Sequence, residues 1–148
     1  MKLLTSVVLS AALVASAFAQ GVVIGAPADG ATVHAGENIT VEVDRPNTLT
    51  GSTEVAVVIG FQVCGDSPAS CPSPDDVMGT ILYNGPYNPT FHTDTAPGFK
   101  PPYENFTVTV PAFAPEGRRA QLNLAHVTLV GAGQFAVLET RNISLNVV

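Results

Sequence analysis

The sequence has no tryptophan and little charge: 12% of its 148 residues are charged. The sequence has six Lys and Arg residues and twelve Asp and Glu residues, so the formal net charge is −6. An acidic chain repels phosphate backbones and anionic lipid headgroups. The composition therefore argues against nucleic acid as a partner and against a role at a membrane surface.

Long apolar runs are absent beyond the N-terminal segment. No later stretch reaches the 18 uninterrupted apolar residues that indicate a transmembrane helix. The last residues, 143–148, alternate like a strand, and no polar spacer and hydrophobic tail of a lipid-anchor signal are seen. We therefore expect no membrane anchor and a free, soluble product.

The first 19 residues are typical of a secretory signal peptide. Lys2 supplies a positive start, Leu3–Val14 is mostly apolar, and Ala17-Phe18-Ala19 fits the small-x-small cleavage pattern. We predict cleavage between Ala19 and Gln20. Residues 20–148 then form one domain, long enough to bury a core. The predicted location is extracellular.

Only two cysteines are present, Cys64 and Cys71. The secretory route is oxidising, so the spacing predicts a disulfide that closes a short loop. A redox pair and a metal site are the alternatives. The six-residue spacer is not C-x-x-C, and no histidine lies nearby, which disfavours both.

Short β-branched runs separated by turn residues fill the rest of the chain. Asn38–Asp44 alternates strictly between apolar and polar residues, and Thr53–Cys64 is apolar on both faces, as in a central strand. The pattern P-x-D-G-x-x-V-x-A-G-E-x-I-x-V at 27–41 looks like the opening of immunoglobulin-like modules. We predict an all-β, antiparallel immunoglobulin-like β-sandwich of seven to eight strands. A small β-barrel is the alternative.

The apolar phase slips within Ala120–Val130. Leu122 and Leu124 share one face of a strand, whereas Ala125, Val127 and Leu129 share the other. Two explanations are open: a bulge near Leu124-Ala125, or a strand that is buried on both faces.

Three sequons match the N-glycosylation pattern, at Asn38, Asn105 and Asn142. Residues two apart in a strand point the same way, and each sequon has an apolar residue in its middle. Each Asn therefore lies on the solvated face, and we predict a glycan on at least one of them.

No catalytic signature is present, and we predict a protein that is not an enzyme, with no metal and no cofactor. His34, His92 and His126 form no metal-binding pattern, and His126 is predicted to be a partly buried residue with a hydrogen-bond partner. Asp75-Asp76 lies in a polar loop, as turn or surface acids do. Secreted fungal copper oxygenases begin with His after processing, whereas this chain would begin with Gln20.

The segment from Tyr83 to Tyr103 is rich in proline and aromatic residues. Its aromatic residues are candidate binding-loop residues: Tyr83, Tyr87, Phe91, Phe99 and Tyr103. Their spacing in multiples of four would suit a helix, but five prolines exclude one. Such a long connection is either a lid over one end of the core or a recognition loop. The lid is favoured.

Several stretches resemble a family of small secreted fungal proteins, the necrosis-inducing secreted protein family. They include LTGSTEVAVVIGFQ (49–62), MGTILYNGPYNP (78–89) and AQLNLAHVTLVGAG (120–133). The resemblance implies an effector that binds receptor-associated plant kinases and suppresses pattern-triggered immunity. It supplies no catalytic residue. The alternative function is a cell-wall or carbohydrate-binding module of the fungus, with Tyr83, Tyr87 and Tyr103 as its sugar platform.

Overall fold

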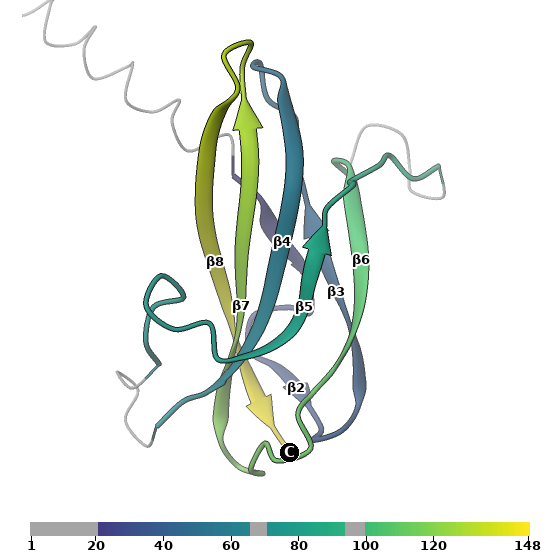
Figure 1. Ribbon diagram of the computed structural model, residues 1–148. Helices are drawn as coiled ribbons and strands as arrows, with labels where there is room; N and C mark the ends of the chain where they lie inside the picture. Colours follow the sequence, from purple (N-terminus) through teal and green to yellow (C-terminus); the bar gives the residue numbers. More distant parts are fainter. Residues whose placement is uncertain (1–20, 66–70, 94–99) are drawn as a thin grey trace, which may run out of the picture.

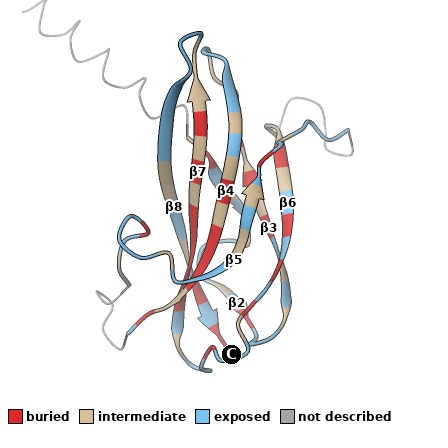
Figure 2. Cartoon of the chain, in the orientation of Figure 1, coloured by how far each residue is buried: buried red, intermediate tan, exposed pale blue. Residues whose placement is uncertain are grey.

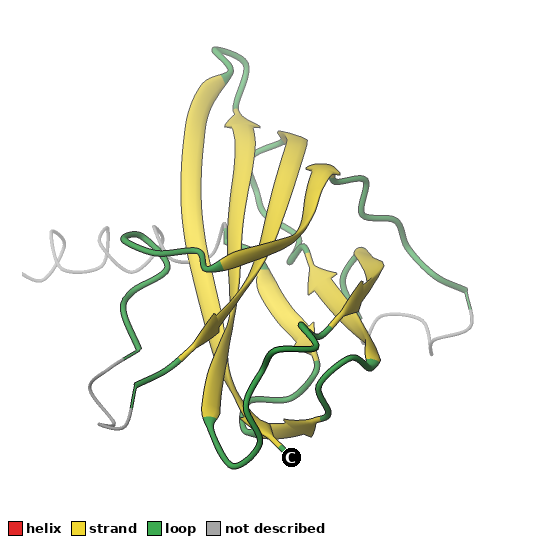
Figure 3. Ribbon diagram, turned by 60° about the horizontal axis from the view of Figure 1, so that its bottom comes forward, coloured by secondary structure: helices red, strands yellow, loops and turns green. Residues whose placement is uncertain are grey.

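The computed structural model describes residues 21–65, 71–93 and 100–148, and eight strands lie in these ranges. They form a three-stranded sheet and a five-stranded sheet that pack face to face (Figures 1 and 3). The strands are β1 (Val23–Ala26), β2 (Ala31–Val33), β3 (Asn38–Asp44), β4 (Ser52–Val63), β5 (Thr80–Pro86), β6 (Tyr103–Thr109), β7 (Arg119–Val130) and β8 (Phe135–Val147).

The strand order confirms the predicted sandwich. The small sheet is ordered β1-β3-β6, and the large sheet is ordered β2-β8-β7-β4-β5. The central trio β8-β7-β4 corresponds to the G-F-C strands of immunoglobulin-like folds, and β5 adds a C′ strand. The chain crosses from the small sheet to the large one between β1 and β2, where β2 pairs with β8 in parallel. The two packed sheets exclude the small β-barrel. The predicted signal peptide and its cleavage site lie outside the described residues.

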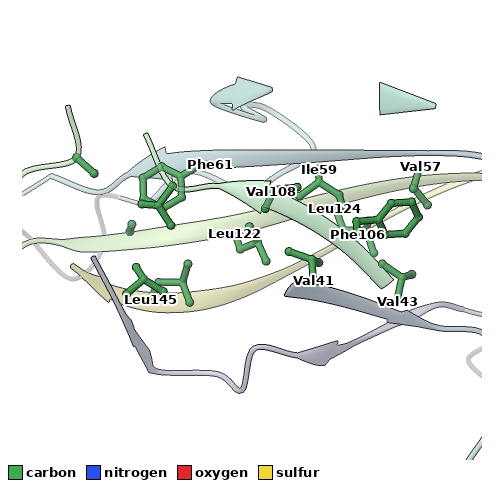
Figure 4. Close-up of a cluster of buried hydrophobic side chains, with 14 of the residues drawn as sticks. Val41, Val43, Val57, Ile59, Phe61, Phe106, Val108, Leu122, Leu124 and Leu145 are labelled. Carbon is green, nitrogen blue, oxygen red and sulfur yellow. The ribbon is translucent and has the colours of Figure 1, made fainter. Parts of the chain in front are cut away.

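The core lies between the sheets, where alternate residues of each strand meet. Val41 and Val43 of β3 face Val57 and Ile59 of β4, and all four are completely buried (Figures 2 and 4). Fully burying an aliphatic side chain of this size stabilises the fold by about 1.5–3 kcal/mol. The alternation predicted for Asn38–Asp44 is thus confirmed, with Glu42 on the opposite face.

The phase slip in β7 agrees with the second predicted explanation in the first half of the strand, where residues 120–124 are buried on both faces. Ala125, Val127 and Leu129, on the outer face of the second half, are partly buried. The register of β7 with β8 runs without interruption from Arg119 to Val130, so there is no bulge at Leu124-Ala125. Gln121 and Asn123 face away from the core, beneath residues 72–78. Their side-chain amides donate to the carbonyls of Pro72 (3.1 Å) and Val77 (3.1 Å).

We call residues 72–78 the covering segment. A disulfide just before it and a close backbone contact at its last residue hold it near the end of β4. The predicted disulfide joins Cys64 and Cys71, with the Cα atoms 4.7 Å apart. Gly60, in the last third of β4, lies against the Met78 carbonyl so closely that a Cβ there would collide with it. A glycine in a strand interior often marks such a close approach of another backbone.

Candidate functional site

Three connections lie toward the same end of the sandwich. They are residues 45–51 between β3 and β4, the described residues 87–93 and 100–102 between β5 and β6, and residues 131–134 between β7 and β8. The turn between β7 and β8 is at the top of Figure 1, and the described part of the β5–β6 connection is at the right. We call this end of the sandwich the upper end. Loops carried on a rigid sandwich are where binding residues concentrate, so the upper end is the candidate site.

A chain of five ionisable residues, basic and acidic in turn, crosses the molecule at this level. Arg45 Nε lies 2.8 Å from Glu54 Oε1, and the other oxygen of Glu54 lies 2.5 Å from His126 Nε2. His126 Nδ1 lies 2.8 Å from Glu139 Oε1, and Arg141 Nη2 lies 2.9 Å from Glu139 Oε2. We call Arg45, Glu54, His126, Glu139 and Arg141 the charge chain.

A bulge in β4 brings Glu54 into the charge chain. Simple alternation from the buried residues Val57 and Ile59 would point Glu54 away from the core. The register shifts between Glu54 and Ala56, however, so Val55 is the extra residue. A bulge exchanges the faces of the residues on its two sides. Glu54 thereby joins the inner face, and the half-exposed Val55 points outward.

Both carboxylates of the charge chain are held ionised. Burial raises the pKa of Glu54, but hydrogen bonds from Arg45 and Ser52 outweigh it, and the net shift is downward. Burial likewise raises the pKa of Glu139, and hydrogen bonds from His126 and the Val22 N–H turn the shift downward. An ionised carboxylate only accepts hydrogen bonds. The two ring nitrogens of His126 each lie next to one of these carboxylates.

The charge chain links the two sheets, and its histidine is not accessible to a substrate. Arg45 follows β3 of the small sheet, and the Val22 N–H before β1 donates to Glu139 at 2.8 Å. His126 was predicted to be partly buried, and the structure buries it completely. A substrate has no access to its nitrogens, which both face carboxylates. The arrangement is suited to fixing the upper end in place.

The predicted binding-loop residues divide into covered and exposed. Tyr87 is buried, its hydroxyl donates to the Val43 carbonyl (3.0 Å), and its ring meets His126 edge-on at 5.4 Å. Burial, and then the charge of Glu54, raise the pKa of Tyr87. Tyr103 is buried with its ring stacked on His92, 3.9 Å between centroids. Tyr87 is thus covered, as the favoured lid of Tyr87, Phe91 and Phe99 predicts for it, whereas Tyr103 belongs to β6.

The other three candidate binding-loop residues are Tyr83, Phe91 and Phe99. The ring of Tyr83 packs on Phe106 with 4.6 Å between centroids, and its hydroxyl donates to the Pro86 carbonyl. Phe91 is exposed. Phe99 lies outside the described residues.

Two open clefts flank the connection at residues 45–51. One, of about 250 Å³, lies between Arg45, Asn47 and Glu54 on one side and Pro89 and Pro102 on the other. The second, of about 490 Å³, runs from Leu49 and Thr53 to Leu129 and Ala132. Leu49, which lines the second cleft, is fully exposed.

All three predicted glycosylation residues, Asn38, Asn105 and Asn142, are exposed. The first two sequons share the outer face of the small sheet, where Thr40 lies directly opposite Thr107. Asn142 lies on the outer face of β8. Glycosylation stays a prediction, but no burial opposes it.

The other residues considered for chemistry have structural partners. His34 Nδ1 lies 3.0 Å from the Val148 carbonyl, and Asp75 accepts a hydrogen bond from Thr140. Within residues 21–65, 71–93 and 100–148, no group of three or more His, Cys, Asp or Glu residues could hold a metal ion. In the same ranges, no helix is long and apolar enough to cross a membrane.

Sequence reasoning missed four members of the charge chain. A signal for two of them was present: Glu139 and Arg141 share the strand phase of Ile143 and Leu145, which are apolar. Charged residues on an apolar phase indicate buried pairing. Glu54 had no such signal, because alternation assigns it to the outer face.

Comparison with known proteins identifies the family. A model of the Nis1 family matches residues 15–146. The chain belongs to the Nis1 family. Membership indicates a fungal effector-like protein, and the Cys64–Cys71 disulfide fits a secreted product. Among curated proteins, none matches the chain. The Nis1-family match spans seven of the described strands and nearly all of β8, so the upper end and the charge chain belong to the family's domain.

Proposed function

We propose that this Nis1-family protein is a secreted, non-enzymatic effector that binds host proteins through its upper end. Its partners would be plant kinases associated with immune receptors, and its effect would be suppression of pattern-triggered immunity. Residues 1–19 would direct it to the secretory route, with cleavage before Gln20. Family membership is the observation that carries this proposal.

The geometry of the upper end supports binding to a protein. Leu49 and Phe91 are exposed on separate connections; Leu49 lines one open cleft, and Phe91 comes two residues after Pro89, which lines the other. The charge chain and Tyr87 hold the strands beneath them in place, which lowers the entropy that ordering would cost on association. Aromatic residues such as phenylalanine are enriched at protein interfaces relative to the rest of the surface.

The burial of the polar residues supports a non-enzymatic role. His126, whose two ring nitrogens lie next to the Glu54 and Glu139 carboxylates, has no exposed surface. General acid or base catalysis needs a group that reaches the substrate directly or through one water.

The alternative, a carbohydrate-binding module, is supported less well. Sugar platforms present the flat face of an aromatic ring, and this sequence has no tryptophan and three tyrosines. Tyr87 and Tyr103 are buried, and Tyr83 packs against Phe106. None of the three leaves a full ring face for a sugar.

The experiment compares two phenylalanines of equal exposure at opposite ends. Phe91 lies at the upper end and is 68% exposed, and Phe113 lies at the lower end and is 69% exposed. The secreted wild type, Phe91→Ser, Leu49→Ser and Phe113→Ser are tested for capture of plant receptor-associated kinase domains and for suppression of the immune oxidative burst. We expect upper-end changes to weaken capture at least about tenfold, and Phe113→Ser to leave it unchanged. Equal retention of all variants on chitin, glucan or cellulose, without kinase capture, would support the alternative.

A further inference from the structure

The first part of β8 has an open edge. β8 pairs with β7 along its whole length, but on its other side β2 covers only Leu145–Val147. Gly30 and Asp29 add hydrogen bonds to Ser144. Among the described residues, no strand pairs with the edge from Phe135 to Glu139. A long uncovered edge presents a row of main-chain donors and acceptors that another strand can pair with.

The side chains of this edge are apolar on both faces of the sheet. Phe135 is 74% exposed, Leu138 is 69% exposed and Val137 is 40% exposed, and Ala136 lies between them. Phe135 and Val137 point to the inner side, beyond the charge chain that closes the core, and Ala136 and Leu138 point to the outer side. Natural edge strands are usually protected by Lys, Pro or a bulge. Residues 135–138 include no such device.

The opposite edge of the same sheet is protected. β5 ends at Pro86, which has no N–H to donate, and its register with β4 is broken between Ile59 and Gly60. In the small sheet, β6 carries the Asn105 sequon and β1 is four residues long. Protection of the other edges singles out the first part of β8 as a pairing surface.

The charges along β8 suit a second copy of the same strand. An antiparallel pair centred on Val137 places Val137 against its symmetry mate and Ala136 against Leu138 of the other copy. Phe135 then lies opposite Glu139, so the two Glu139 side chains are at opposite ends of the seam. No like charges face each other, although the chain as a whole is acidic.

We propose that two copies of this protein pair antiparallel through residues 135–139 of β8, around a two-fold axis at Val137, and join their five-stranded sheets into one. Such an interface is isologous, because the same residues supply both sides. It is also small, with about five residue pairs, so the dimer is weak and in exchange with the monomer. The inference is independent of the proposed host binding, which uses Leu49 and Phe91.

The first test measures mass against concentration for the secreted protein, by sedimentation equilibrium up to the highest soluble concentration. We expect a monomer–dimer equilibrium. Val137→Lys puts a charge in the seam and should raise the dissociation constant at least about tenfold. Ile81→Lys is the matched control, since Ile81 is also a half-exposed apolar residue on an edge strand. It should leave the equilibrium unchanged.

The second test determines the register by cross-linking. Under mild oxidation, Val137→Cys should form a covalent dimer because the two residues are directly opposite across the axis. Leu138→Cys should not, because the two copies would be more than about 7 Å apart, beyond the reach of a disulfide. A monomer at all concentrations, a dimer that survives Val137→Lys or is lost in Ile81→Lys, or cross-linking of Leu138→Cys in preference to Val137→Cys would each overturn the proposal. So would a monomer that takes up only a strand of another protein at this edge.

Discussion

His126 on β7 and Glu139 on β8 are direct partners in the register of the large sheet, and His126 Nδ1 lies 2.8 Å from Glu139 Oε1. The same imidazole meets Glu54 on its other side, from β4. One completely buried residue thus joins three adjacent strands through its two ring nitrogens. Removing it is costly, because the buried carboxylates that it faces lose a polar partner.

The first prediction concerns the loss of the buried His126 side chain. His126→Ala leaves Glu54 and Glu139 facing each other without a donor between them, and we expect a loss of about 3–5 kcal/mol of unfolding free energy. Urea unfolding monitored by circular dichroism measures the change. His34→Ala, at an exposed position, is the control and should change stability by less than about 0.5 kcal/mol. A His126→Ala protein as stable as the control would show that the charge chain does not brace the sheets.

The second prediction concerns acid. The pKa values of Glu54 and Glu139 lie below their ordinary value of 4.5 in the folded protein. At pH values above 4.5 their stabilisation is fully present, and as the pH falls through the folded pKa values it is lost, because the unfolded chain binds protons first. Glu139→Gln should therefore be less stable than wild type at about pH 7, and the difference should shrink below pH 4.5. Thermal unfolding of both proteins across this range checks it, and a constant difference would contradict the assignment.

The third prediction concerns Gly60. An alanine Cβ there would collide with the Met78 carbonyl, and Met78 belongs to the segment that covers Asn123. We expect Gly60→Ala to destabilise the fold by about 1–3 kcal/mol, as overpacking does. Gly51→Ala is the matched control, since nothing lies within 4 Å of the position that its methyl group would take. Unfolding midpoints in urea distinguish the two variants. Equal midpoints would mean that the covering segment can shift to make room for the methyl group without loss of stability.

The fourth prediction separates the lid from the surface within one connection. Tyr87→Ser removes a buried ring and the hydrogen bond to Val43, and should cost about 3–5 kcal/mol. Phe91→Ser removes an exposed ring and should change stability by less than about 0.5 kcal/mol. Differential scanning calorimetry gives both values. If the two variants melt together, the division of this segment into lid and surface is wrong.

Much of the fold was readable from local patterns. The alternation of Asn38–Asp44 and the doubly apolar run in Thr53–Cys64 predicted a strand with one solvated face and a central strand, because side chains in a strand alternate with period two. The Cys64–Cys71 bridge was predictable because so short a spacing leaves few other arrangements in an oxidising compartment. The burial of His126 with partners was also predicted.

The division of the aromatic segment was not readable from the sequence. Tyr87 and Phe91 have the same proline-rich surroundings, yet one is buried and the other is exposed. What separates them is the position of His126 and the Val43 carbonyl, which come from other strands. Local composition has no information about such partners.

The sequence by itself determined the strands, the sandwich class, the disulfide and the solvated faces of the sequons, because each depends on residues close together in the chain. Only the tertiary structure decided the charge chain and the open edge of β8. Glu54 reaches His126 because a bulge at Val55 reverses its face, and the bulge exists only in the pairing of β4 with β7. The edge at residues 135–139 is open because β2 pairs with β8 only near its end. Both depend on which strands become neighbours, and that is decided by packing across the whole domain.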